Sequence, residues 1–365
     1  MTSRVLLVGG GSLGHVAPLI AVWKEMQTLL PHASAHVLCA KREDEIDFCR
    51  DAGLPATGLP RLRSSPTAIV AFLRGFVTSW RVIRARRPSV VFCKGGSLSI
   101  PAVITARIYG IPVVLHESDA VIGRANRFLA WFAKSVCTGQ RIVDAGCQVV
   151  GSHCYHPTSN ISHLIFTGNP VRPEMTRGRR AEGLRITGLK GDRPILLVLG
   201  GSQGAQAINE AVVAQLPQLL ASCDVIHITG RGKHGAAPQT GYVPLTFARG
   251  ELAHIFAIAT LAVTRGGAGS ISELTACAVP MLIVPIRGLA QDHQWKNARA
   301  AERLGIASVL EQDDLPRLAE TVSALLVSQA TLDAMRERAR RQPADAARRI
   351  AKVVLDILAQ ENQRP

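Results

Sequence analysis

The chain has 365 residues, 47% of them hydrophobic, and a formal net charge of +15 at pH 7. This length suits two domains better than one core, and this hydrophobic content excludes a largely disordered chain. The positive charge indicates an acidic partner, such as a phosphate-bearing substrate or an anionic membrane. Aromatic residues make up only 4% of the chain and do not interleave with the basic clusters, so nucleic acid is not expected as a partner.

Hydropathy and cysteine usage narrow the class further. No apolar run approaches the roughly 18–20 residues that span a bilayer, and residues 1–11 lack the features of a signal peptide. The eight cysteines form no C-x-x-C pair, so we expect reduced thiols in a cytoplasmic protein. The densest cluster, CQVVGSHCYHP (147–157), does not match zinc-site spacing, and no metal is predicted.

The first half of the chain alternates short β-rich runs with helical stretches. The predicted strands are 4–10, 34–40, 89–96, 111–117 and 135–139, and the predicted helices are 15–30, 67–87, 99–110 and 123–133. Strands of this length alternating with helices are typical of parallel βαβ units whose sheet is buried on both faces.

The second half begins the same design again. Residues 194–216 (PILLVLGGSQGAQAINEAVVAQL) repeat the order of strand, glycine turn and helix, and 224–230, 261–267, 281–286 and 307–310 supply further strands. Residues 172–194, which are charged and contain Gly and Pro, are predicted to be a linker. Residues 344–362 predict an amphipathic helix with Ala347, Ile350, Val354 and Ile357 on one face. We therefore predict an α/β fold of two Rossmann-like domains facing each other.

The first glycine turn has two interpretations. Gly9, Gly11 and Gly14 form G-x-G-x-x-G after a strand, as in dinucleotide sites. Such a site also needs an acidic residue near the end of the second strand, where Lys41 and Arg42 come first. A nucleotide-dependent oxidoreductase therefore ranks below a phosphate-binding loop that carries an ionisable side chain, His15.

Four later motifs carry polar groups suited to a nucleotide sugar. The turn at Gly200–Gln206 can present backbone N–H groups to phosphate, although a simple packing turn is an equal alternative. Glu273 ends RGGAGSISE and could accept both hydroxyls of a ribose, or merely favour the helix dipole. QDHQWKNA (291–298) offers amide donors, and HESD (116–119) follows a strand at the sheet edge where α/β ligands bind.

In this order the motifs resemble those of the MurG family of GT-B glycosyltransferases, which add N-acetylglucosamine (GlcNAc) to lipid I to make lipid II. The family's G-G-T-G-G-H loop is similar to GGSLGH (10–15), H-E-Q-N to HESD, and S-G-A-x-T-x-x-E to GGAGSISE (266–273). TGNPVR (167–172) and GGSQGA (200–205) match the family letter for letter, and QDHQ (291–294) matches its Q-D-x-Q. The resemblance covers most of the chain.

The resemblance implies an acceptor- and membrane-binding domain (1–166), a UDP-GlcNAc-binding domain (167–345) and a C-terminal helix (346–365) that packs back on the first domain. It implies that Glu273 binds the ribose, that Arg172 and Ser202 contact the diphosphate, and that Ala248 lies near uracil. Gln291 and Gln294 would bind GlcNAc hydroxyls. A turn along UDP and the sugar would be formed by Ala268, Gly269, Ser270, Ile271 and Ser272. Ser12, Leu13 and Gly14 would form the acceptor-side loop, with Asp119 at the acceptor. No cofactor or catalytic metal is implied.

The implied reaction is an inverting displacement by the 4-hydroxyl of N-acetylmuramic acid (MurNAc), which needs a general base. His15 is the first candidate, and His116 with Glu117 the reserve. Leu13 and Asp119 depart from the family pattern, so a different lipid or natural-product acceptor is the alternative. A non-catalytic sugar-nucleotide or membrane-binding protein is a further alternative.

Within the predicted helix at 67–87, residues 69–87 include apolar residues at near-helical spacing among arginines. They are Ile69, Phe72, Phe76, Trp80 and Ile83. Such a helix can lie on an anionic membrane or turn its apolar stripe to the core, and the pattern favours neither. If the first holds, the protein is peripheral at the cytoplasmic face of the membrane, with UDP-GlcNAc, lipid I and other cell-wall synthesis proteins as partners.

Overall fold

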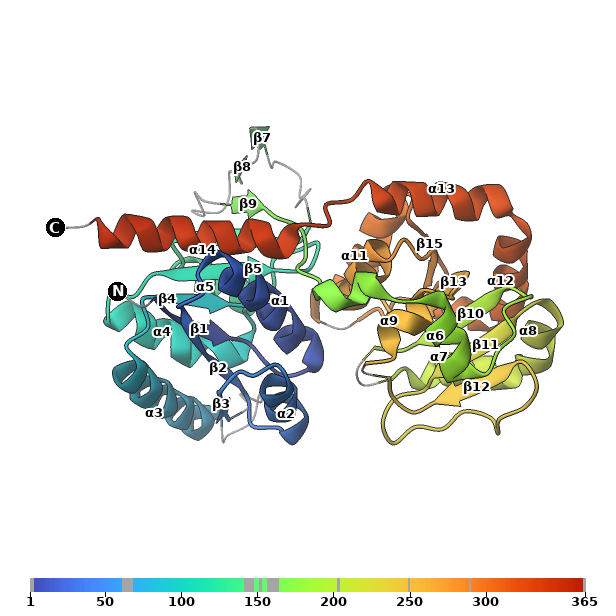
Figure 1. Cartoon of the computed structure of the whole chain (residues 1–365), viewed down its shortest axis with the longest axis horizontal. Coiled ribbons are helices and arrows are strands. Elements are labelled where there is room, and N and C mark those ends of the chain that lie inside the picture. The colour runs from blue at the N-terminus through green and yellow to red at the C-terminus, as the bar shows by residue number, and fades with distance from the viewer. Residues whose placement is uncertain are drawn as a thin grey trace. The chain divides into compact units, whose positions relative to one another are not determined.

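The computed structural model describes residues 3–60, 68–140, 148–150, 153–155, 164–201, 204–248, 250–288 and 290–363. The chain divides into two compact units (Figure 1). The N-terminal unit comprises 1–172 and 345–365, and the C-terminal unit comprises 173–344.

The N-terminal unit is built on a nine-stranded sheet of order β3-β2-β1-β4-β5-β6-β9-β8-β7. The strands are β1 (Arg4–Val8), β2 (Ser34–Ala40), β3 (Ala56–Leu59), β4 (Val90–Cys93), β5 (Val113–Glu117), β6 (Ser135–Thr138), β7 (Gln148–Val150), β8 (His153–Tyr155) and β9 (Leu164–Phe166). All neighbours from β3 to β9 pair in parallel, whereas β8 pairs antiparallel with β9 and with β7. The sequence did not predict β3, β9 or the β7–β8 hairpin.

Helices cover both faces of this sheet, as the continuous apolar strands predict. The helices are α1 (Leu13–Leu29), α2 (Glu43–Asp51), α3 (Ala68–Arg86), α4 (Ile100–Ile108), α5 (Arg124–Ala130) and α14 (Ala346–Asn362), with the 3-10 turn η1 (Ser97–Ser99) before α4. In β1, Leu7 packs toward α1 and α14, while Leu6 packs toward α3, α4 and α5.

Helix α14 belongs to the N-terminal unit although it follows the C-terminal unit in sequence. It lies beside α1 (Figure 1), and the four predicted apolar residues are all buried in the core that the two helices share. The Lys134 ammonium binds Glu361 near its end at 2.6 Å. The predicted apolar face is thus confirmed.

The C-terminal unit has a six-stranded parallel sheet of order β12-β11-β10-β13-β14-β15. Its strands are β10 (Ile195–Leu199), β11 (Asp224–Ile228), β12 (Tyr242–Leu245), β13 (Leu261–Thr264), β14 (Met281–Ile283) and β15 (Ala307–Val309). Its helices are α6 (Arg180–Thr187), α7 (Gln206–Ala214), α8 (Leu216–Ser222), α9 (Leu252–Phe256), α10 (Ala268–Ala276), α11 (His293–Arg303), α12 (Leu318–Val327) and α13 (Gln329–Arg340), with 3-10 turns η2 (Pro173–Arg177), η3 (Ala290–Asp292) and η4 (Gln312–Arg317).

The segment predicted as a linker is structured over much of its length. It forms η2 and α6, and both pack against α9 inside the C-terminal unit. Gly183 makes this packing possible, because a Cβ there would lie 2.3 Å from the His254 carbonyl oxygen. The high charge of the segment reflects an exposed helix face rather than a flexible connection.

Helix α3 has one face that packs on the core and another that is exposed. Ile83 is buried in the core and Phe72 and Phe76 are half-buried, so the predicted stripe is split. The exposed apolar face consists of Ile69, Val70, Leu73, Val77 and Trp80. Among the described residues, no helix is both long and apolar enough to cross a bilayer.

Candidate active site

The glycine loop after β1 is held by a buried carboxylate. The Gly11 N–H, at a φ of +108°, donates to Glu45 Oε1 at 3.0 Å, and the Ala40 N–H donates to Glu45 Oε2 at 3.0 Å. Gly10 has no room for a side chain, because a Cβ would lie 2.4 Å from the Ala40 nitrogen. Burial raises the pKa of Glu45, and these two hydrogen bonds oppose that rise. Sequence reasoning missed Glu45, which stands in an otherwise ordinary acidic helix start.

The predicted acceptor loop runs into the first turn of α1. Ser12 occupies the N-cap position, Leu13 begins the helix, and the His15 N–H donates to the Ser12 carbonyl at 3.0 Å. Gly14 is exposed, while the Leu13 and His15 side chains are half-buried. A half-buried imidazole in the first turn of a helix at the carboxyl edge of a parallel sheet can meet both water and a ligand.

His116 is fully buried and both of its ring nitrogens are engaged. Its Nδ1 lies 3.1 Å from the Lys94 ammonium and its Nε2 lies 3.1 Å from the Gly168 carbonyl oxygen. Since an ammonium can only donate, Nδ1 accepts and Nε2–H donates. Burial, and then the Lys94 charge, holds the pKa of His116 well below its usual range.

The Glu117 carboxylate, like the His116 ring, is hydrogen-bonded to neighbouring groups. Its carboxylate accepts the Asp119 N–H at 3.0 Å, the Gly123 N–H at 3.1 Å and the Asn126 side-chain amide at 2.8 Å. Burial raises the pKa of this carboxyl, and nearby Asp119 raises it further. The Asn126 oxygen in turn accepts the Gly96 N–H at 2.8 Å, so Glu117 fixes the loop before α4 through Asn126.

Lys94 is the second residue that sequence reasoning missed. It follows β4, is 4% exposed, and its ammonium contacts the Ser118 hydroxyl as well as His116. The backbone carbonyl of Ser118 accepts the Asn169 amide at 3.0 Å. The loops after β4, β5 and β9 are therefore one hydrogen-bonded network. The only local signal was a lysine placed between an apolar strand and a glycine pair.

Arg172 closes the N-terminal unit. Its guanidinium lies over the Phe48 ring of α2, 5.6 Å from the ring centroid, which is cation–π distance. Arg172, which is predicted to bind the diphosphate, is thus positioned by α2. It is the last residue before the chain enters the C-terminal unit.

In the C-terminal unit, the turn after β10 depends on missing side chains. A Cβ at Gly200 would lie 2.2 Å from the Ala205 nitrogen, and one at Gly204 would lie 2.3 Å from the Thr229 carbonyl oxygen. A Cβ at Gly201 would lie 4.0 Å from the Ser270 hydroxyl, which places this turn beside the start of α10. Ser202 lies outside the described residues.

The residues predicted as a turn from Ala268 to Ser272 form the first two turns of α10. The glycine turn ends at Gly267, which is the N-cap, and the Ile271 N–H already donates to the Gly267 carbonyl at 3.1 Å. The geometry of an α-helix gives the N–H groups of Ala268, Gly269 and Ser270 no carbonyl within the helix. These groups and the positive helix end suit a phosphate. Glu273 follows in the second turn and is half-buried.

The QDHQ loop packs directly on the same edge. A Cβ at Gly266 would lie 2.1 Å from the Gln294 carbonyl oxygen, and the Asn297 amide donates to the Gly266 carbonyl at 3.0 Å. Gln291 and Asp292 both have left-handed backbone, with φ of +65° and +58°. Two strained non-glycine residues in succession are typical of functional loops. Gln294 Oε1 is buried and accepts no hydrogen bond from any described residue.

The remaining predicted residue, Ala248, follows the carboxyl end of β12 and is half-buried.

The structure also places a buried cation at the carboxyl edge of this sheet that sequence reasoning missed. Arg265 donates to the Val284 carbonyl at 3.1 Å, and burial lowers its pKa. Among the described residues, no group of three His, Cys, Asp or Glu side chains is arranged to hold a metal ion.

The glycosyltransferase family 28 N-terminal domain model matches residues 5–138, and the C-terminal domain model matches 195–352. A relative from Geobacillus kaustophilus, named UDP-N-acetylglucosamine–N-acetylmuramyl-(pentapeptide) pyrophosphoryl-undecaprenol N-acetylglucosamine transferase, is 34% identical over 86% of this chain and 87% of its own length. A relative of the same name from Oceanobacillus iheyensis is 33% identical, covering 86% of each chain.

The chain belongs to the MurG family of glycosyltransferases.

Solved structures agree on the fold. Acinetobacter baumannii MurG is 22% identical and covers 98% of this chain and 100% of its own, with a TM-score of 0.71. The glycosyltransferase of kitacinnamycin, 18% identical, covers 98% of this chain and 100% of its own with a TM-score of 0.69. The predicted GT-B fold class, with two parallel-sheet α/β domains, is confirmed.

Proposed function

We propose that this member of the MurG family transfers GlcNAc from UDP-GlcNAc to the 4-hydroxyl of MurNAc in undecaprenyl-diphospho-MurNAc-pentapeptide, converting lipid I to lipid II. The observation that carries the proposal is the 34% identity, over 86% of the chain, to a transferase named for this reaction. The sheet edges of the two units supply suitable groups for the two substrates.

The donor nucleotide sugar binds at the sheet edge of the C-terminal unit. The first-turn N–H groups of α10 face the diphosphate, and Glu273 accepts the ribose hydroxyls. Gln294, whose buried side-chain oxygen accepts no bond from the described residues, and Gln291 bind sugar hydroxyls. Ala248 lies toward uracil, while Ser202 and Arg172 add donors at the diphosphate. The reaction uses no catalytic metal, because the helix N-terminus and Arg172 stabilise the departing UDP.

His15 acts as the general base. The 4-hydroxyl oxygen attacks the anomeric carbon, its proton passes to the His15 imidazole, and the bond between that carbon and the UDP oxygen breaks with inversion. His116 is less suited to this role, because its free lone pair already accepts from the Lys94 ammonium. His15 is half-buried, so its ring can be reached by an acceptor.

Attachment to the cytoplasmic face of an anionic membrane brings the protein to its lipid acceptor. The exposed apolar face of α3 supports this part of the proposal, with Ile69 71% and Leu73 55% exposed. Arg84 stacks over Trp80 at 5.3 Å, which places a cation at the border of that face. An apolar face with flanking arginines can insert into the headgroup region of an anionic leaflet.

The central test measures UDP release from UDP-GlcNAc with a lipid I analogue, using UDP-glucose and UDP-GalNAc as controls. We expect release only with UDP-GlcNAc and lipid I. The His15→Ala variant should lose 10²–10⁴-fold in transfer rate, the usual contribution of a general base, while it still binds UDP. Transfer to another lipid but not to lipid I would replace the acceptor, and full activity of His15→Ala would remove the base assignment.

A further inference from the structure

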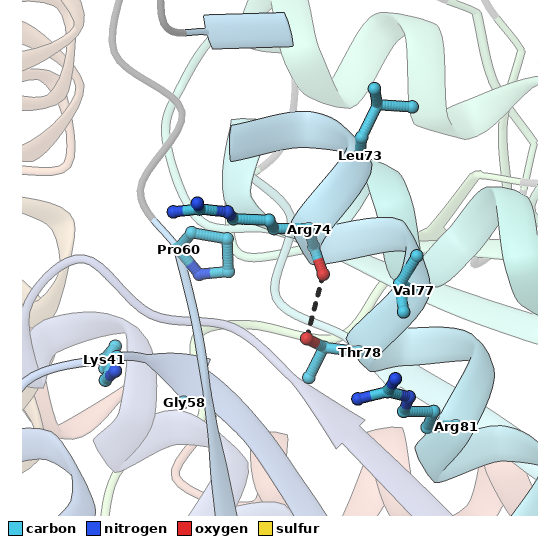
Figure 2. Close-up of a pocket in the computed structure, with 8 residues that line it drawn as sticks. All are labelled: Lys41, Gly58, Pro60, Leu73, Arg74, Val77, Thr78 and Arg81. Carbon is cyan, nitrogen blue, oxygen red and sulfur yellow. Dashed lines mark hydrogen bonds between the residues drawn. The ribbon is translucent and has the colours of Figure 1, made fainter. Parts of the chain in front are cut away.

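Two lysines lay their side-chain stems across glycines near the carboxyl edges of the sheets. Lys41, just after β2, lines a pocket of about 480 Å³ beside α3, and a Cβ at Gly58 would lie 3.1 Å from its Cγ (Figure 2). Lys233 follows β11 in the C-terminal unit, and a Cβ at Gly204 would lie 3.0 Å from its Cδ. Gly204 belongs to the turn after β10, whose backbone N–H groups suit a phosphate. Lys233 is thus a cation beside the proposed donor site.

A tight turn fixes the backbone of Lys233. Its N–H donates to the Gly230 carbonyl at 3.2 Å, which closes a turn of four residues. Gly232 is the third residue of this turn and has a φ of +70°, a conformation that favours glycine. The Lys233 carbonyl accepts the Thr229 hydroxyl at 3.2 Å. Hydrogen bonds on both sides of the residue therefore set the point from which its side chain leaves the loop.

The loop that carries Lys233 is joined to the loops on either side of it. Toward β12, the Thr229 N–H donates to the Leu245 carbonyl at 2.9 Å and the Gly230 N–H donates to the Thr246 carbonyl at 3.1 Å. Toward β10, a Cβ at Gly204 would lie 2.3 Å from the Thr229 carbonyl oxygen and 3.1 Å from the Gly230 Cα. The loops after three neighbouring strands are therefore packed together, and this packing holds the lysine stem against the glycine turn.

The two cations of this loop have different neighbours. The Arg231 guanidinium lies over the Phe247 ring, 4.9 Å from the ring centroid, so this cation is held at the loop after β12. The Lys233 ammonium lies just beyond the Cδ that packs on Gly204, and can therefore reach an oxygen bound at the glycine turn. Across the described ranges of the chain, no carboxylate forms an ion pair with either side chain. A phosphate at this turn would thus meet a lysine whose charge is not neutralised by a carboxylate.

We propose that the Lys233 ammonium binds the diphosphate of the donor nucleotide sugar. The inference rests on the proposed function and deepens it, because it adds a cation of the C-terminal unit to the neutral backbone N–H groups at the diphosphate. An ammonium suits this role as a compact charge with three donors. As the bond between the anomeric carbon and the UDP oxygen breaks, negative charge grows on the diphosphate. Lys233 stabilises that charge on the departing UDP.

The test titrates UDP into the full-length protein by calorimetry, without acceptor, and measures uridine binding by its competition with UDP. Lys233→Gln should weaken UDP binding about 10- to 100-fold, as expected for the loss of a charged hydrogen bond, and should change uridine binding less than twofold. Lys233→Arg keeps the charge and should stay within about fivefold of the wild type for UDP. The matched control, Lys190→Gln, removes an exposed lysine before the amino end of β10 and should change UDP affinity less than twofold.

Three outcomes overturn the proposal: unchanged UDP affinity in Lys233→Gln, equal weakening of UDP and uridine in that variant, or equal weakening of UDP in Lys233→Gln and Lys190→Gln. Equal weakening of UDP and uridine would mean that Lys233 only supports the loop. The proposed function fails separately. If UDP binding depends on Lys233 but no GlcNAc reaches lipid I, the acceptor is wrong and the Lys233 site stands. If the wild type binds no uridine nucleotide, the donor and this site are both wrong.

Discussion

The two units fix the loops at the carboxyl edges of their sheets in different ways. In the N-terminal unit, buried ionisable side chains do so, with Glu45 on the glycine loop, Lys94 on His116 and Glu117 on Asn126. In the C-terminal unit, missing side chains and neutral amides do most of this, at Gly200, Gly204, Gly266, Asn209 and Asn297, and one buried cation, Arg265, adds to them.

The two sheets share an order of six parallel strands, and the difference shows that this order allows two kinds of loop support. Buried ionisable groups cost desolvation free energy and depend on every partner being present. Glycine contacts carry no charge but tolerate no added atom. We therefore expect the N-terminal edge to respond to charge removal and the C-terminal edge to respond to added volume.

Removing the Lys94 charge should produce the largest effect. In Lys94→Met the ammonium no longer holds His116 and Ser118, so the HESD loop loses its position and the transfer rate should fall about 100-fold or more. UDP affinity should stay within twofold, because the proposed UDP site lies in the other unit. Steady-state kinetics with UDP titration checks both, and Lys352→Met, an exposed lysine on α14, is the control. Equal loss of UDP binding would contradict the separation of the two edges.

Adding one methyl group to the C-terminal edge should produce the reverse pattern. Gly266→Ala places a Cβ 2.1 Å from the Gln294 carbonyl, so the QDHQ loop must move and the KM for UDP-GlcNAc should rise about 30-fold. Gly250→Ala is the matched control, because a Cβ there meets no atom within 4 Å and the residue lies outside α10. If the two variants behave alike, close packing at residue 266 does not support the donor site.

Acid should affect both units through buried histidines, His227 in the C-terminal unit and His36 as well as His116 in the N-terminal unit. Burial lowers the pKa of His36 and of His227 to about 4, from 6.5. The folded protein keeps both rings neutral while the unfolded chain takes up protons, so this stability is present above pH 6.5 and is lost as the pH falls toward 4. Between pH 6.5 and 5 the loss should be about 1.5 kcal/mol per histidine, measured by urea unfolding.

His227→Gln should remove the contribution of the C-terminal unit to this pH dependence of the unfolding free energy. His227 bonds Tyr242 at 2.9 Å and Asn209 at 3.0 Å, both neutral groups, so its titration is decided by burial. An unfolding free energy of the wild type that does not change between pH 6.5 and 5 would rule out neutral buried rings in the folded state.

The smallest effect is expected at the exposed charges of the C-terminal unit. Glu311 accepts Arg287 at 3.0 Å, Arg299 at 2.8 Å and the Trp295 indole N–H at 3.0 Å. The bonds from Arg287 chiefly hold the pKa of Glu311 below its usual value. Because Arg287 is 60% exposed, Glu311→Gln should cost only about 1 kcal/mol of unfolding free energy, and less in 0.5 M salt. A loss of several kcal/mol would mean that this unit, too, relies on charge.

The fold was largely predictable because most strands are continuous apolar runs. The runs RVLLV and ILLVL predict β1 and β10 from local sequence alone. Of the missed strands, β3 (ATGL) and β12 (YVPL) contain Gly or Pro and lie at a sheet edge, where local preference is weak. The other three, β7, β8 and β9, have only three residues each, too few to show a periodic pattern.

The candidate site was predictable where backbone conformation dictates residue type. Glycine patterns predict the loops around Gly11, Gly201 and Gly267. By contrast, no local pattern predicts that the Glu45 or Lys94 side chain is buried. Those positions depend on strands distant in sequence, since Lys94 meets His116 only when β4 and β5 pair. A helix was expected to begin one turn before Glu273, but its start at Ala268 was missed, because glycine and serine disfavour a helix interior and yet suit its first turn.

Helix α14 sets an order of events for a chain made from its N-terminus. Ile350 and Val354 complete the core around α1, yet they are translated only after all of the C-terminal unit. During synthesis, α1 therefore waits with its apolar surface uncovered while some 170 further residues emerge and fold. The unit that begins first finishes last, and in that interval it is the part of the nascent chain most in need of a chaperone.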